Sequence, residues 1–450
     1  MAKYLSLFII ALGFQLTAFS QENSPYSRYG LGDQAPDHNI VTRGMGGISA
    51  AYVSPRYDSA RNGKNTQVIN MNAQSINYIN PATYSNFYRN TIFDLGAEVG
   101  SRKLKSINPV KNFTSTNALF SYMQLGIPIK MKKANKKDIF LGVNIGLKPD
   151  TRVNYKLARF KREVDSLVIF EEGSGGTNEA FTGVGLSIKN FSIGFNIGYK
   201  FGTKDSSSQI TFLNDTIAYY ESNASTKTNF GGLLFNAGIQ YKFKLKDSSE
   251  FRIGAYGSLK QKYSASKDVI RETVSYDADG ASTRIDSVYE NNIRGNVVYP
   301  SNFGVGVTLQ KQHWLFGADF EMTNWKEFRF YDKADFTDNS WKLRVGTEYY
   351  PATNKTPLKK YFNFVRYRAG FYYGPNAVNL TTVPEYAFTF GAGFPLKLRR
   401  GFYDDQNSML NTAIEIGSRG DNKSNLKENF FRVSFGVSLS DLWFRRYKYD

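Results

Sequence analysis

The stretch FSIGFNIGYKF, residues 191–201, decides the fold because its residues alternate strictly between two kinds. Odd positions carry large apolar side chains and even positions carry small or polar ones, so an extended strand has one apolar and one polar face. The alternation recurs in LLFNAGIQYKF (233–243), WLFGADFEM (314–322) and WKLRVGTEY (341–349). Polar segments such as GTKDSSSQ (202–209) and KLKDSSE (244–250) are predicted to connect the strands. The sequence predicts an all-β protein with strands of about ten residues.

Two architectures fit such strands, a transmembrane antiparallel β-barrel and a soluble β-sandwich. The predicted strands are longer than the roughly 5–6 residues of ordinary sheets. Aromatic residues also gather at the strand ends, in the pairs Tyr199 and Phe201, Tyr241 and Phe243, and Tyr349 and Tyr350. Aromatic girdles of this kind mark the two membrane interfaces of a barrel. We therefore predict the barrel, with the sandwich as the alternative.

Composition narrows the function classes. The 450 residues include no cysteine and two histidines, which excludes disulfides, a catalytic thiol, thiolate ligands and multi-histidine metal sites. His38 lies in an irregular segment and His313 lies beside a strand start, so we assign no catalytic residue, metal or cofactor. Aromatic residues make up 16% of the chain, although the mean hydropathy is −0.42. A barrel accounts for both numbers, since alternate residues alone face lipid.

The N-terminal residues and the distribution of charge indicate an exported membrane protein. Residues 1–20 combine a basic start, an apolar run and Ala18-Phe19-Ser20, which predicts a signal peptide with Gln21 as the mature start. The formal net charge is +18, but the basic residues are scattered, with the densest run at KMKKANKKD (130–138). We expect contacts with outer-membrane lipid and lipopolysaccharide, and no nucleic-acid partner.

Residues 21–90 differ from the rest, because they are rich in Gly, Asn, Ser and Pro and lack sustained alternation. Irregular backbone cannot face lipid, since its polar groups would have no partner there. We predict a plug at 21–90 inside the barrel, a barrel at 91–444 and a short tail at 445–450. Glycines on the polar strand faces, such as Gly194, Gly254 and Gly346, leave room for a plug; tight barrel curvature is the other explanation.

Two motifs carry a family resemblance. RGMGGISAAY (43–52), followed by NYINPATYSNF (77–87), resembles the N-terminal hatch of the FadL/TodX (OmpP1) family of outer-membrane transport proteins. The segments at 172–202, YPSNFGVGV (299–307), EYAFTFGAGFPL (385–396) and NFFRVSFGVSLSDLWF (429–444) resemble its Bacteroidota-type branch. Two departures are the polar stretch SPRYDSARNGKNTQ and the residues RRYKYD that follow Trp443-Phe444.

The resemblance implies a barrel of about 14 strands in the Gram-negative outer membrane, plugged by the hatch. It also implies passive uptake of hydrophobic or amphiphilic, fatty-acid-like solutes, through hatch movement or a gap in the wall. The hatch or gating residues are then Asn80, Pro81, Ala82, Arg43, Gly44, Gly46 and Gly47, with a fixed junction as the alternative.

The inward strand faces are polar, which opposes a continuous apolar tunnel. The predicted lumen-facing polar residues are Asn196, Lys200, Asn236, Gln240, Lys242, Asp319, Glu321 and Arg344. An open porin for polar solutes is a second hypothesis. A third is a non-transporting structural subunit of a secretion or barrel-assembly machine, with outer-membrane or periplasmic proteins as partners.

Overall fold

The computed structural model describes residues 24–55, 75–87, 90–107, 110–129, 139–162, 166–213, 219–245, 249–276, 282–353, 356, 359–375, 377, 384–396, 407–420 and 426–441. Within these ranges, no helix has the length and apolar character needed to cross a membrane. The predicted signal peptide and C-terminal tail, and the stretch 56–74, lie outside the described residues.

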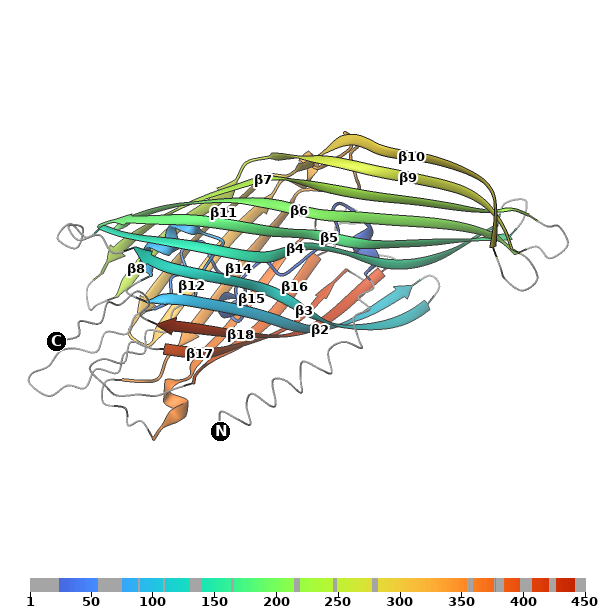
Figure 1. Ribbon diagram of the computed structural model, residues 1–450. Helices are drawn as coiled ribbons and strands as arrows, with labels where there is room; N and C mark the ends of the chain where they lie inside the picture. The colour runs from blue at the N-terminus through green and yellow to red at the C-terminus, as the bar shows by residue number, and fades with distance from the viewer. Residues whose placement is uncertain are drawn as a thin grey trace, which may run out of the picture.

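The chain is built almost entirely of strands (Figure 1). The barrel strands are β2 (Thr91–Ile107), β3 (Val110–Ile129), β4 (Ile139–Arg162), β5 (Ser166–Ile188), β6 (Phe191–Phe212), β7 (Glu221–Lys244), β8 (Glu250–Ser258), β9 (Gln261–Tyr276), β10 (Ser282–Tyr299), β11 (Asn302–Lys311), β12 (Trp314–Thr323), β14 (Ser340–Tyr349), β15 (Arg366–Pro375), β16 (Pro384–Pro395), β17 (Asn407–Arg419) and β18 (Leu426–Asp441). The short elements are η2 (Pro25–Arg28), β1 (Asp33–Gln34), α2 (Ile40–Arg43), η3 (Pro81–Asn86), η6 (Trp325–Glu327), β13 (Arg329–Phe330) and η7 (Tyr361–Phe364).

Neighbouring strands pair antiparallel around a closed ring. β8 and β9 both pair with β7 and form the two halves of one barrel strand, and β10 and β11 form another in the same way. β18 pairs with β2 from Asp441↔Thr91 to Leu426↔Ser106, which closes the barrel. The ring has 14 strands, as predicted.

The alternation of β6 becomes an outward and an inward face. The six odd-numbered side chains from Phe191 to Phe201 are 40–50% exposed on the lipid side, whereas Ser192, Asn196 and Lys200 are at most 5% exposed inside. The predicted pattern is confirmed. Lipid tails would cover the outward side chains, which in the isolated chain have no protein neighbour above them.

Strand length departs from the prediction. β4, β5, β6 and β7 run for 24, 23, 22 and 24 residues, although about 9–11 residues cross a bilayer. The segment GTKDSSSQ, predicted as a connection, lies within β6. Beyond the membrane both faces of a strand meet water, so the apolar alternation stops while the ladder continues.

The long strands form a sheet that runs past the rest of the barrel, towards the right of Figure 1. We use the name projecting sheet for the outer parts of β4 to β7 together with β9 and β10. It lies at the end of the barrel opposite the two-residue turn between β5 and β6. We assign this end to the outer surface because the strands that reach beyond the membrane lie there, and outer-membrane barrels carry their larger extensions on the extracellular side.

The wall is interrupted between β3 and β4. Their ladder runs from Ile129↔Leu141 to Met123↔Leu147 and stops there. Beyond it, β3 continues paired with β2 on one side, and β4 continues paired with β5 on one side. Figure 1 shows β2 and β3 diverging from β4 towards the outer end. We call this opening the wall gap.

The N-terminal residues 24–54 and 75–87, here the lumenal segment, lie against the inner wall. Their apolar side chains form small buried clusters, one of which joins Val41, Met45, Ile48 and Tyr52 to Leu315 of β12. Elsewhere wall and segment meet backbone to backbone at glycines. A Cβ placed on any of seven wall glycines would lie within 3.0 Å of the backbone of this segment. This glycine belt consists of Gly142, Gly185, Gly194, Gly254, Gly346, Gly370 and Gly391.

Inward glycines therefore do more than allow curvature, because a larger residue would collide with the segment. We predict that Gly194→Ala lowers the free energy of unfolding by about 1–3 kcal/mol, the usual cost of overpacking. Its Cβ would lie 2.2 Å from the carbonyl carbon of Pro81. Urea unfolding in detergent micelles measures the change.

Gly100→Ala is the matched control. Its nearest neighbour is the side-chain Oδ1 of Asn117 at 2.9 Å, which can move aside. Equal losses in the two variants would show that backbone contact with the segment is not what the belt provides.

Candidate functional site

Asn80 fastens the lumenal segment to the barrel wall. Its Oδ1 accepts a hydrogen bond from the backbone N–H of Ala82 (3.1 Å) and so caps η3, whose first residue is Pro81. Its Nδ2 lies 2.6 Å from the carbonyl oxygen of Ala50, 3.2 Å from that of Ile239 and 3.3 Å from that of Ala255. One buried amide thus joins two stretches of the segment to β7 and β8, and Pro81 starts the helical turn because it needs no N–H partner there.

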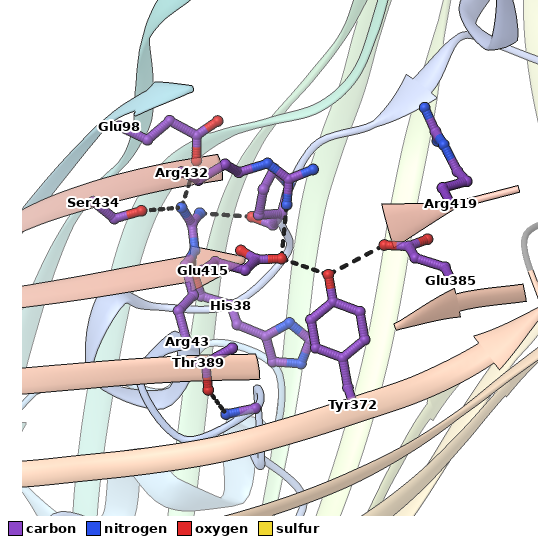
Figure 2. Close-up of polar contacts among 12 residues, drawn as sticks. His38, Arg43, Glu98, Tyr372, Glu385, Thr389, Glu415, Arg419, Arg432 and Ser434 are labelled. Carbon is purple, nitrogen blue, oxygen red and sulfur yellow. Dashed lines mark hydrogen bonds and ion pairs between the residues drawn. The ribbon is translucent and has the colours of Figure 1, made fainter. Parts of the chain in front are cut away.

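Arg43 makes the second attachment, at the end of α2 (Figure 2). Its Nη1 lies 2.6 Å from Oε2 of Glu98 and 3.4 Å from Oγ of Ser434, on β2 and β18. Its Nε donates to the carbonyl oxygen of His38 (2.7 Å). The guanidinium therefore orders the turn before α2 and ties it to the strands that close the barrel.

The glycines after α2 bring its turn onto the wall. Gly46 and Gly47 have φ of 69° and 86°, a region in which a side chain is strained. The N–H of Gly46 donates to Oγ1 of Thr389 (2.8 Å), as Figure 2 shows. Gly44 lies against Gly391 of the glycine belt. The seven predicted hatch residues thus gather in two contact regions with the wall, while their role in gating stays a prediction.

The inner wall carries buried ion pairs. Figure 2 shows Arg432 beside Glu415, with 2.9 Å between Nη1 and Oε1, and the Tyr372 hydroxyl between Glu415 and Glu385. Arg419 lies 2.7 Å from both Asp33 of the segment and Glu428. Further buried pairs are Arg368–Glu348, Arg344–Glu321, Lys200–Asp150, Lys200–Glu179 and Lys148–Glu179. These charges neutralise one another.

The predicted lumen-facing residues mostly bind the segment. The side-chain amides of Asn196, Asn236 and Gln240 donate to the carbonyl oxygens of Tyr78, Ile79 and Ala50. Asp319 accepts from the N–H groups of Ser49 and Ala50, at 2.5 and 2.7 Å, and Arg344 donates to the carbonyl oxygen of Gly46. Lys200 and Glu321 form ion pairs with other wall residues, and Lys242 is half-buried.

Two polar cavities lie beside the segment. One of about 130 Å³ is lined by His38, Lys342, Arg344, Glu385 and Glu415, among others. A second of about 100 Å³ shares Asp37, Asp150, Tyr299, Asn302 and Glu321 with the first. Charged and hydroxyl groups dominate the larger cavity, which therefore suits water better than an apolar solute, whereas the second cavity is also lined by Ile79, Phe181 and Leu234. Neither cavity resembles an apolar tunnel.

His38 faces the larger cavity and is 6% exposed. Burial, joined by the positive charges of Arg344 and Arg43, lowers the pKa of His38 well below its usual value. The imidazole is therefore neutral near pH 7. Its Nε2 has no hydrogen-bond partner within the described part of the chain.

Sequence reasoning missed Glu98, Glu415, Arg419 and Arg432 as interior residues. A signal existed, because Arg432 follows the outward Phe431 in FFRVSFG and so falls on the inward face of its strand. Arg419–Glu428 and Arg432–Glu415 pair across one hairpin, whereas the contacts of Glu98 with Arg43 and of Arg419 with Asp33 join distant parts of the chain and could not be read from it.

The family model described as BamG matches residues 1–450. The chain belongs to the BamG family. No curated protein sequence matches it.

Solved structures similar to this BamG-family chain include two toluene transporters and a FadL homologue. The toluene transporter TodX of Pseudomonas putida has a TM-score of 0.54 at 16% identity, with 91% of this chain and 99% of TodX covered. The toluene transporter TbuX of Ralstonia pickettii gives 0.52 at 13%, covering 89% and 97%. A FadL homologue of Pseudomonas aeruginosa gives 0.52 at 13%, covering 91% and 99%.

At these identities the likeness concerns the fold. It confirms the fold that the FadL/TodX resemblance implies, while the location in the Gram-negative outer membrane stays a prediction. The assignment to a Bacteroidota-type branch stays a prediction.

We predict that Asn80→Ala loosens the lumenal segment. The variant loses three hydrogen bonds to buried carbonyl groups, which should cost about 2–4 kcal/mol of unfolding free energy. Hydrogen exchange should accelerate in residues 44–52 and 75–87. The control is Asn112→Ala, at an exposed position on β3. Unchanged exchange in Asn80→Ala would contradict its anchoring role.

We also predict that acid weakens the fold through His38. The unfolded chain binds a proton at His38 as the pH falls through about 6.5, whereas the folded chain resists it, so stability falls below that pH. The wild type should lose up to about 1.4 kcal/mol per pH unit more than His38→Gln between about pH 6.5 and 5. Urea midpoints measured in parallel test this, since other titrating groups cancel in the difference. Parallel pH profiles would refute it.

Proposed function

We propose that this protein is a plugged barrel that serves as a partner-binding subunit of a larger outer-membrane machine. The family name BamG is consistent with the barrel-assembly alternative among such machines. The observation that carries the proposal is the fixed seating of the lumenal segment, through the glycine belt, Asn80 and Arg43.

The energetics of the lumen support a plug that stays in place. Removing one member of a buried ion pair costs about 3–5 kcal/mol, because the other charge is left without a partner. Movement of the segment would separate Arg43 from Glu98 and Asp33 from Arg419 together. It would also free Asp319 from two backbone N–H groups. A gate that opens in each transport cycle would have to overcome these losses at once.

Uptake of hydrophobic solutes is the second candidate, and the wall gap favours it. An apolar solute could leave the lumen sideways where β3 and β4 separate. The similar structures TodX and TbuX are described as toluene transporters, which suggests monoaromatic or fatty-acid-like solutes. The polar cavities oppose this candidate, as does Arg152 of β4, whose Nη2 donates across the gap to the carbonyl oxygen of Phe120 (3.2 Å).

Purification of the full chain from native outer membranes in mild detergent separates the two candidates. We expect stoichiometric companion proteins, no steady conductance in planar bilayers and no binding of toluene or a fatty acid at micromolar concentration. The double variant Arg43→Ala with Asn80→Ala should conduct, because both attachments are lost, and it shows that the assay detects an open lumen. An isolated wild-type monomer that binds toluene and carries it into liposomes would establish the channel instead.

A further inference from the structure

The wall gap leaves one edge of β3 without a neighbouring strand on the outer surface. From Val110 to Tyr122 this strand pairs with β2, while its ladder with β4 begins at Met123. The carbonyl oxygen of Phe120 points into the gap, since it accepts from Arg152 of β4. Alternate residues of an antiparallel strand direct their backbone groups to the same side, so Ala118, Thr116 and Thr114 also face the gap.

Strand addition already occurs across the gap, on the edge of β4. There β1 pairs through Asp33↔Arg152 and Gln34↔Thr151, and the N–H of Ser24 donates to the carbonyl oxygen of Asn154 (3.0 Å). The chain thus covers part of the β4 edge with its own backbone. No such cover is described for the β3 edge. An unpaired edge of this length is a template for another strand.

The surroundings of the β3 edge are basic. Between Val99 and Tyr122 the sequence contains no Asp or Glu, and among its basic residues Arg102 is buried and already paired with Asp33 and Glu428. Lys103 and Lys105 are exposed, and Lys427 of β18 lies opposite Lys105 in the ladder. Phe113, 47% exposed, adds an apolar contact on the same strand. A strand that pairs here would enter a positive field.

We propose that the outer edge of β3, from Asn112 to Ala118, is the docking site for an extended acidic strand of a partner protein. This inference rests on the proposed function and names the surface that the partner uses. A second copy fits poorly, because edge-to-edge pairing would bring two basic flanks together. A lipid headgroup would match the lysines but not the free backbone groups of the edge.

Thr116→Pro tests the edge directly. Its backbone faces the gap, so proline removes a free N–H without breaking the β2–β3 ladder. Thr116→Val is the matched control, since it keeps both the N–H and the side-chain shape. Heat-modifiability on SDS gels verifies that both variants fold.

The probe is a fluorescent heptapeptide of alternating Val and Glu, added to the full chain in detergent. We expect the wild type and Thr116→Val to bind it, Thr116→Pro to bind at least tenfold more weakly, and salt to weaken binding. Equal binding by Thr116→Pro, or equal binding of a Val-Lys peptide, would overturn the proposal.

The companion proteins give the second readout. Thr116→Pro should lose a companion that Thr116→Val retains in mild detergent. If the wild type retains none, the proposed function fails, while the peptide still reports on the edge. If the wild type is a dimer and Thr116→Pro is a monomer, the occupant of the edge is a second copy. That result would overturn the acidic-partner proposal. Displacement of the peptide by lipopolysaccharide, with equal effect in all three chains, would assign the site to lipid instead.

Discussion

The structure depends on the contact between irregular backbone and a wall that presents glycines where the two approach most closely. Irregular backbone at membrane depth needs protein partners for its polar groups. Wall side chains such as Asn196, Gln240 and Asp319 supply these partners to the lumenal segment. The approach is so close that a Cβ added to Gly254 would lie 1.9 Å from the Ala50 carbonyl oxygen, and one added to Gly142 would lie 2.0 Å from the Tyr84 carbonyl oxygen. The wall strands therefore have to satisfy two requirements. Their outward faces suit lipid, and their inward faces fit one particular loop.

Buried ion pairs between the segment and the wall oppose movement of the segment. Asp33 of the segment accepts from Arg419 of β17 and Arg102 of β2, so one carboxylate connects the plug to both sides of the barrel closure. Each ion in such a set is stable because its partners are in place, and the loss of one leaves the others buried without compensation. A lumen built in this way resists partial opening. That property suits a structural barrel, and a channel with the same fold would need a route that leaves these pairs intact.

The fold followed from local pattern, whereas most of the site depends on contacts between distant residues. The alternation from Phe191 to Phe201 predicted a barrel strand because lipid selects every second residue. The same reasoning failed from Gly202 to Phe212, where water covers both faces and no pattern marks the strand. Asn80 could be singled out from its motif. Its acceptors at Ile239 and Ala255 lie 159 and 175 residues away and become visible only once the barrel has closed.

The wall gap begins where the sequence of β4 prevents regular pairing. The ladder with β5 shifts register between Pro149 and Thr151, and proline has no N–H to give. Across the ladder, Gly175 and Gly176 adopt φ of 123° and 140°, which side chains rarely allow. A bulge of this kind bends its strand and increases the local twist. It therefore bends β4 close to the point where its ladder with β3 ends. The β2–β3 ladder is irregular at the same level, since Gly96↔Tyr122 is followed by Ala97↔Phe120. The wall gap thus opens where both strands that border it depart from regular pairing.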